Sequence, residues 1–297
     1  MVREFYSNQG GAEKTGQKEI RSEIERLFRL DDSEREVPES AEKLENDLQD
    51  FDFAWLLDWL KTMSKRIPDQ KKFKDEVKGV NGIIWNEEEG FIGSYNLIKN
   101  VISLNPKRIE NKVDWAVEDG LDEELSRKLI LARALIHEYI HVYSMNRCYG
   151  LEVVSEDKTG TLVTETGLET SQHDVTSGQL TDKEVDFEYA NEGLVDLLSE
   201  GIFLNYLDEI GVDIDAQDQF NQFYETMDPY HQQREFMLDL IEKITEDSGI
   251  PFQVAFEGFI HQLQAGGKLD NEVQKWFVEL VGVELFDRMK GRNKTNV

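Results

Sequence analysis

The sequence predicts an α+β protein that is predominantly helical, with a small sheet that precedes one long helix in the sequence and packs on it. Three observations lead to this fold class. Apolar residues have helical spacing near the N-terminus, short β-type runs follow from about residue 80, and helical spacing then returns and continues towards the C-terminus. With 297 residues, of which 39% are hydrophobic, the chain is long enough to bury a real core.

The N-terminal region, which we place at residues 1–78, is expected to be helical. Apolar residues recur at helical spacing in IRSEIERLFRL (20–30) and again in FAWLLDWLKTM (53–63). The acidic stretch DDSEREVPESAEK (31–43) contains a proline and separates the two, so it is predicted to be a linker.

A mixed core is predicted at residues 79–210, and it begins with a small sheet. The runs GIIWN, GFIGSYN and NVISLN are short and β-type, and Gly, Asn and finally Pro106 punctuate them. One long helix is expected next, at 121–147, because Asp122 to Glu124 suit the positive end of a helix dipole and Gly150 suits a helix terminus. Its predicted inward stripe consists of Leu125, Leu129, Ala132, Leu135, Ile136 and Ile140.

The segment at residues 151–187 is rich in Thr, Ser, Gly and acidic residues. Two runs within it, LEVVSE (151–156) and GTLVTET (160–166), are predicted to pair as a hairpin, and the rest is expected to be loop.

Helical spacing returns at 191–207 and defines the last helix of the mixed core. The C-terminal region at 211–297 is expected to be helical, with two or three helices between residues 217 and 290. Gly-Ile-Pro at 249–251 and Gly-Gly at 266–267 are the predicted breaks.

Charge and composition exclude several classes of function. The chain has 33 basic and 61 acidic residues, a net charge of −28, which repels phosphate backbones and argues against a nucleic-acid partner. Its single cysteine, Cys148, cannot form an internal disulfide. Since the sequence shows neither a signal peptide nor an apolar run long enough to span a membrane, we expect a soluble, cytoplasmic protein with no membrane partner.

The stretch IHEYIH carries the chemistry that the sequence suggests most directly. His137 and His141 are four residues apart, so on a helix both imidazoles lie on one face and can bind the same metal ion. Glu138 then lies beside the ion rather than on it. With Zn²⁺ as cofactor, this pattern is typical of amide hydrolysis by an activated water, with the carboxylate as general base.

A catalytic zinc site of this type needs a third protein ligand. Metzincins would supply it six residues after the second His, following a Gly at the third, but Ser144 and Arg147 occupy those positions. Downstream, Asn191-Glu192-Gly193-Leu194-Val195-Asp196 places two carboxylates four residues apart on a predicted helix.

Together with H-E-x-x-H, this N-E-x-x-x-D element resembles the gluzincins, such as thermolysin. The resemblance implies that Glu192 is the third zinc ligand and that Asp196 hydrogen-bonds the far nitrogen of a ligand His. An acidic first turn of a helix is the plain alternative for both residues. Glu188, His173 and Asp174 are the other candidates for the third ligand.

The gluzincin resemblance also implies an edge strand that pairs with the substrate backbone, and residues 100–106 (NVISLNP) are in the expected place. An ordinary strand that covers the core is the alternative for this run. Gluzincins further use a His or Tyr to stabilise the oxyanion. Tyr230 and His231 are the best candidates for that role, and Tyr206 and Tyr224 compete with them. The plain alternative is that Tyr230 and His231 are surface residues at the start of a helix.

The expected function is therefore that of a zinc-dependent peptidase with a peptide or protein substrate. One alternative is an inert or regulatory binding protein that keeps the zincin fold. Another is a metallo-hydrolase of a non-peptide amide such as a deformylase, although that family takes a ligand from an upstream Cys and Cys148 follows the motif. A protease restricted to one partner is a third, since the polar segment at 151–187 lies between the two metal motifs.

Overall fold

The computed structural model describes residues 36–65, 80–88, 90–144, 146–154, 159–176, 179–265, 278 and 282–284. Within them the helices are η2 (Glu39–Ala41), α2 (Glu42–Asp50), α3 (Phe53–Lys65), α4 (Pro106–Glu118), α5 (Glu123–Tyr143), α6 (Glu188–Glu209), α7 (Ile214–Met227), α8 (His231–Ser248) and α9 (Phe252–Ala265). The strands are β1 (Gly82–Trp85), β2 (Gly93–Asn96), β3 (Val101–Leu104), β4 (Asn146–Val154), β5 (Thr159–Thr166), β6 (Glu169–Thr176) and β7 (Gln179–Asp186).

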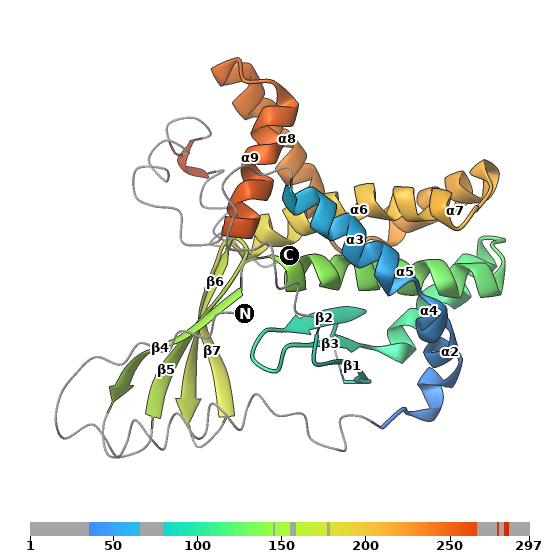
Figure 1. Ribbon diagram of the computed structural model, residues 1–297, viewed down its shortest axis with the longest axis horizontal. Coiled ribbons are helices and arrows are strands. Elements are labelled where there is room, and N and C mark those ends of the chain that lie inside the picture. Colours follow the sequence, from blue (N-terminus) through green and yellow to red (C-terminus); the bar gives the residue numbers. More distant parts are fainter. Residues whose placement is uncertain are drawn as a thin grey trace.

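Helix α5 is the centre of the molecule (Figure 1). The small sheet lies along one side of it and α6 along another, while α2, α3 and α4 also pack against it. Every residue from Leu129 to His141 is buried. The predicted stripe was therefore too narrow, because a helix covered on several sides buries its polar positions as well as its apolar ones.

The small sheet has three strands in the order β1-β3-β2, with β3 parallel to β1 and antiparallel to β2. All four residues of β3 are buried. The expectation that residues 100–106 form the edge strand was wrong, because β3 pairs on both sides. The strand at the edge beside α5 is β2.

A second sheet, with the antiparallel order β4-β5-β6-β7, extends away from the helices (Figure 1). The predicted hairpin is confirmed, since Glu152, Val153 and Val154 pair with Thr161, Gly160 and Thr159. The prediction of loop for the rest of the segment was wrong, because β6 and β7 continue the sheet. Their polar sequences give a weak strand signal. Such sequences can still form strands, because an antiparallel sheet can expose one face to water.

Helix α5 begins as predicted and ends earlier. The Asp122 carboxylate accepts a hydrogen bond from the Leu125 amide at 2.9 Å and caps the first turn. At the other end, the Asn146 side-chain amide donates to the carbonyls of His141, Val142 and Ser144, each at 2.9 Å. The helix therefore stops at Tyr143, and the predicted terminating residue, Gly150, belongs to β4 instead.

Two helices were missed. Helix α2 begins at the end of the predicted linker, and α4 begins at Pro106, which was predicted to end the small sheet. Proline suits the first turn of a helix, and the Asn105 side chain caps that turn by accepting from the Arg108 amide at 3.1 Å.

The helix predicted at 53–63 is confirmed as α3, and the one at 20–30 lies outside the described residues. Helices α7, α8 and α9 confirm the helical C-terminal region, and Gly249, with φ of 72°, ends α8 at the predicted break. The predicted break at 266–267 also lies outside the described residues.

A single buried apolar cluster includes residues from all three predicted regions, such as Leu56, Leu135 and Leu240. The predominantly helical α+β class is confirmed. Among the helices described, none has the length and apolar character needed to cross a bilayer.

Candidate metal centre

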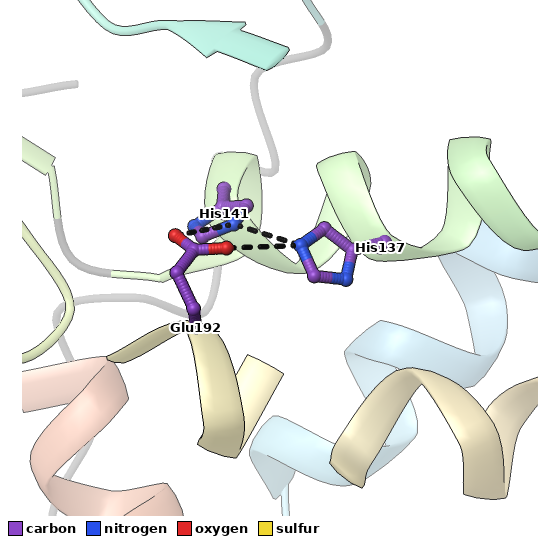
Figure 2. A group of neighbouring side chains, drawn as sticks. All are labelled: His137, His141 and Glu192. Atoms are coloured by element: carbon purple, nitrogen blue, oxygen red, sulfur yellow. Dashed lines mark hydrogen bonds and ion pairs between the residues drawn. The ribbon is translucent and has the colours of Figure 1, made fainter. Parts of the chain in front are cut away.

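Three side chains from two helices converge on one point (Figure 2). His137 and His141 come from α5, and Glu192 comes from the first turns of α6. The two Nε2 atoms are 3.3 Å apart, and the Glu192 carboxylate lies 3.3 Å from Nε2 of His137 and 3.4 Å from Nε2 of His141. Among the residues described, these three form the group of His, Cys, Asp and Glu side chains suited to a metal ion.

The distances within this cluster fit a tetrahedral zinc ion. Two ligand atoms that each lie about 2.0–2.1 Å from such an ion are about 3.3–3.4 Å from one another. The donor set of two imidazoles and one carboxylate is also one that zinc accepts in sites that keep a fourth position open. Two imidazole nitrogens and a carboxylate that face one another at this range need protons or a metal ion between them.

Glu138 lies next to the cluster without belonging to it. The side chain is 3% exposed and is directed towards the start of β2. A Cβ on Gly93 would lie 3.0 Å from Oε1 of Glu138 and 3.1 Å from its Cγ. The absence of a side chain at residue 93 thus leaves room for this carboxylate between α5 and the edge strand.

The second ring nitrogen of His137 faces Asp196, one turn after Glu192 on α6. Nδ1 of His137 is 3.6 Å from Oδ1 of Asp196, longer than a good hydrogen bond but close enough for a strong electrostatic interaction. A carboxylate on this side favours the tautomer with the proton on Nδ1, which leaves the lone pair of Nε2 for a metal.

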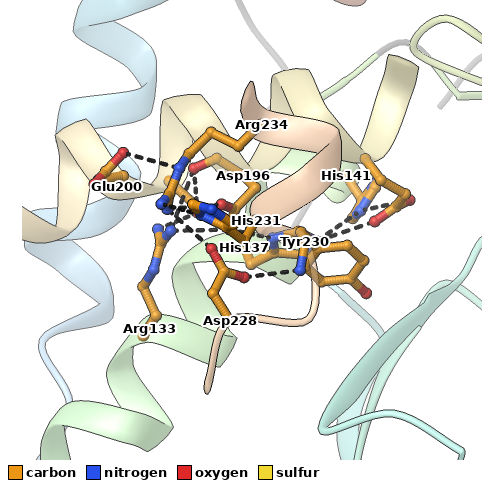
Figure 3. A network of polar contacts seen from close by, with 11 residues as sticks. Arg133, His137, His141, Asp196, Glu200, Asp228, Tyr230, His231 and Arg234 are labelled. Atoms are coloured by element: carbon orange, nitrogen blue, oxygen red, sulfur yellow. Dashed lines mark hydrogen bonds and ion pairs between the residues drawn. The ribbon is translucent and has the colours of Figure 1, made fainter. Parts of the chain in front are cut away.

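Asp196 itself belongs to a buried network of charges (Figure 3). Arg133 donates to its Oδ1 at 2.9 Å, and Arg234 approaches its Oδ2 at 3.3 Å. Arg234 also pairs with Asp228 at 2.9 Å, and Arg133 also donates to Ser199. The cations of this network compensate the charge of Asp196, which is 1% exposed.

The electrostatics of the metal-free cluster follow from this arrangement. Burial disfavours the charged form of His137, but its contacts with Asp196 and Glu192 outweigh burial and raise the pKa to about 10. The pKa of His141 is also raised, since the attraction of Glu192 exceeds the cost of burial. Burial opposes ionisation of Glu192, yet the two imidazoles lower its pKa below the usual range. Without a metal, the cluster binds protons in its place.

The turn between α7 and α8 brings Tyr230 to the site. Its ring stacks on the His137 ring, with centroids 4.6 Å apart and an angle of 11° between the planes. The Tyr230 amide donates to the Asp228 carboxylate at 2.9 Å, and Asp228 is held in turn by Arg234. Burial and the nearby carboxylates raise the pKa of Tyr230, so that its hydroxyl keeps its proton.

Close packing of α6 and α8 supports this position of Tyr230. A Cβ on Gly193, next to Glu192, would overlap the backbone carbonyl of Gln233 in the first turn of α8. His231, the neighbour of Tyr230, is exposed and lies 3.3 Å from Arg234 through Nδ1. Of the two predicted oxyanion donors, the structure brings only Tyr230 to the cluster.

A cavity of about 150 Å³ opens beside the cluster. It lies between residues 90–93, which lead into β2, and helices α4 and α5, and the ends of α7 and α8 complete it. His137, Glu138 and Tyr230 form part of its wall, and so does Tyr224. A molecule in this cavity would contact His137 and the candidate base, Glu138.

The other residues considered from the sequence lie elsewhere. His173 bonds to the Thr164 hydroxyl at 2.8 Å within the second sheet, and Asp174 is exposed. Glu188, in the first turn of α6, is not part of the cluster. Tyr206 packs on Phe51 and Trp55, away from the metal centre.

Several charged residues near the site were missed in the sequence. Arg133 is one turn before His137 on α5 and is 2% exposed, so a lone arginine inside the apolar run was a usable signal. Lys112 belongs to α4, one of the two helices that were not predicted. Asp228 and Arg234 reach the site only through tertiary packing. Glu169, in which burial raises the pKa to about 7 beside Glu192, had no sequence signal.

No protein-family model, curated protein or solved structure matches the chain significantly, so its geometry is the basis for assigning a function.

Proposed function

We propose that the protein is a zinc-dependent peptidase of the gluzincin type, with His137, His141 and Glu192 as the metal ligands. The observation that carries this proposal is the convergence of the three side chains. The two Nε2 atoms are 3.3 Å apart, one carboxylate oxygen of Glu192 lies 3.3 Å from Nε2 of His137, and the other lies 3.4 Å from Nε2 of His141, which are separations that suit the ligands of a tetrahedral zinc ion. Zinc in such a site lowers the pKa of water towards neutrality and polarises a carbonyl group.

The roles of the surrounding residues follow from their positions. Glu138 takes the proton of the attacking water and passes it to the leaving amine, since its carboxylate lies beside the ligands and lines the cavity. Asp196 holds His137 in the ligating tautomer. Tyr230, with a hydroxyl that stays protonated and a side chain on the cavity wall, is the proposed donor to the developing oxyanion.

Strand β2 favours a peptide as the substrate. It lies at the edge of the small sheet, and its first residue, Gly93, adjoins Glu138. An extended peptide that pairs with a sheet edge gains backbone hydrogen bonds, while its side chains alternate between the two faces. Its scissile bond then comes to the base and the ligands.

A peptide-library cleavage assay read by mass spectrometry tests this proposal. Glu138→Gln is expected to keep its zinc but to lower the cleavage rate by about 10²–10⁴, because only the proton acceptor is removed. Glu124→Gln is the matched control, since Glu124 is on the same helix but pairs with Lys128 at the surface.

Equal cleavage by wild type and Glu138→Gln contradicts the assignment of the base. A zinc-loaded wild type that cleaves none of the peptides contradicts the peptidase assignment and favours an inert binding protein or a hydrolase of non-peptide amides.

A further inference from the structure

The cavity beside the metal centre has a charge opposite to that of the chain as a whole. The protein has a net charge of −28, yet two cations line this cavity, Arg108 and Lys112. They are four residues apart on α4 and so lie on the same face of that helix. Among the described residues that line the cavity, Glu138 is the only carboxylate.

Lys112 belongs to the inner part of the cavity. It is 7% exposed, although lysine is among the residues least often buried. Its ammonium lies 5.0 Å from the centre of the Tyr224 ring, which also lines the cavity. Burial lowers its pKa to about 8, against the opposing effect of Asp228 and Asp196, so most of the lysine is charged at neutral pH.

The mouth of the cavity has a different character. Arg108 and Asn111 are exposed there, and so are two large aromatic residues, Phe91 at 56% and Trp115 at 47%. Exposed aromatic side chains around a cavity are typical of a binding site. The volume of about 150 Å³ is well below the roughly 300–1,000 Å³ of pockets for drug-sized ligands, which suits one side chain or one chain end.

We propose that this cavity binds a carboxylate of the substrate residue next to the scissile bond, with the Lys112 ammonium as its main partner and Arg108 at the mouth. This inference rests on the proposed peptidase function, because it is the shared wall with His137 and Glu138 that puts the carboxylate beside the reacting bond. The carboxylate has two possible sources: the side chain of Glu or Asp, or the C-terminus of the substrate.

Binding of matched peptides tests the inference without relying on turnover. The protein is zinc-loaded Glu138→Gln, and calorimetry compares two pairs of short peptides. The first pair contains Glu or Gln at one position, with both C-termini amidated. The second pair has Gln there in both peptides and differs only in a free or amidated C-terminus.

In one of the two pairs, the peptide with the carboxylate is expected to bind about tenfold more tightly, and that pair identifies the source. Adding Lys112→Met is expected to bring the ratio close to one, while Lys112→Arg keeps part of it. Arg108→Gln, at the exposed mouth, should reduce the preference by a smaller factor. Lys128→Met is the control, because Lys128 is on the outer surface of α5 and pairs with Glu124.

Equal binding within both pairs, or no binding at all, overturns the inference, as does a preference that persists in Lys112→Met. Cleavage by wild type distinguishes this failure from that of the proposed function. If the wild type cleaves peptides but shows no carboxylate preference, the peptidase proposal stands and the carboxylate-binding site is contradicted. If the carboxylate preference depends on Lys112 but the wild type cleaves no peptide, the binding site stands and the peptidase proposal is contradicted.

Discussion

The two nitrogens of His137 face carboxylates that differ in how their charge is compensated. Asp196, near Nδ1, has two arginines within 3.3 Å. Glu192, near Nε2, meets the imidazoles of His137 and His141 in the described part of the chain. Imidazoles offset a negative charge only when they are protonated. The negative charge of Asp196 is therefore already compensated by arginines, and we call this the Asp196 side. The charge of Glu192, on the Glu192 side, is compensated only when the imidazoles are protonated or a metal ion is bound.

This difference separates the expected effects of substitutions. Changes on the Glu192 side should act on metal binding, and changes on the Asp196 side should act on both stability and metal binding. Changes in the packing between α6 and α8 should act mainly on stability.

The largest effect is expected from His141→Ala, which removes a ligand and leaves the Asp196 side intact. Zinc affinity should fall by more than the 10–100-fold typical of losing a supporting hydrogen bond. Competition with a chromophoric chelator measures the affinity. The control is His261→Ala, an exposed histidine on α9, and an equal loss of zinc in that variant contradicts the site.

The pH dependence of zinc binding should be almost as large. The pKa of His137 is raised to about 10 in the metal-free protein and that of His141 is also raised, so zinc must displace their protons. Affinity is expected to rise with pH from 6 to 9, by about tenfold per pH unit for each proton released. Calorimetry in buffers of different ionisation enthalpy counts these protons, and a count of zero contradicts the charge state proposed for the cluster.

The same pKa shift predicts how pH affects the stability of the metal-free protein. Because the folded-state pKa of His137 lies above the ordinary value of 6.5, its protonation stabilises the fold fully below pH 6.5. That contribution is lost as the pH rises through about 10. Denaturant unfolding of metal-free protein between pH 6 and 10 should show the decline, and an increase would contradict it.

Asp196→Asn should lower both the stability of the fold and the affinity for zinc, because Asp196 contacts both the arginines and His137. Arg133 and Arg234 would lose a buried negative partner, at a cost of about 3–5 kcal/mol in the free energy of unfolding. Zinc affinity should also fall by about 10–100-fold, since His137 loses the group that fixes its tautomer. Denaturation and metal titration measure the two effects, and a loss of affinity without destabilisation would contradict the role given to the network.

The smallest effect is expected from Gly193→Ala. The added methyl group would meet the carbonyl of Gln233 and push α8 away, which should cost about 1–3 kcal/mol in stability. Gly201→Ala is the matched control, because it is on the same helix with open space around its Cα and should stabilise by about 0.5–1 kcal/mol. If both variants behave alike, helix packing at Gly193 does not matter.

Local patterns in the sequence accounted for much of the fold. The spacing of apolar residues predicted α3, α5, α6 and the C-terminal helices, and the Asp122 cap was visible as an acidic start. Strand order was not predictable, because the central place of β3 depends on its pairing with both β1 and β2, which no local pattern reveals. Strands β6 and β7 were missed because their polar residues carry no clear alternation.

The candidate site divides in the same way. His137, His141, Glu192 and Asp196 were identified because each pair is four residues apart on one helix, and the structure brings the first three together. Lys112, Asp228 and Arg234 come from other helices, so no spacing in the sequence could reveal their contacts. His231 was paired with Tyr230 in the sequence, but consecutive residues at the start of a helix point in different directions.

The central claim is that His137, His141 and Glu192 together hold one zinc ion. Zinc content after equilibrium dialysis at pH 8 tests it most directly, on wild type, Glu192→Ala and His173→Ala. We predict about one zinc per chain in wild type and in His173→Ala, and far less in Glu192→Ala. Wild type without zinc, or full zinc in Glu192→Ala with loss in His173→Ala, would contradict the claim.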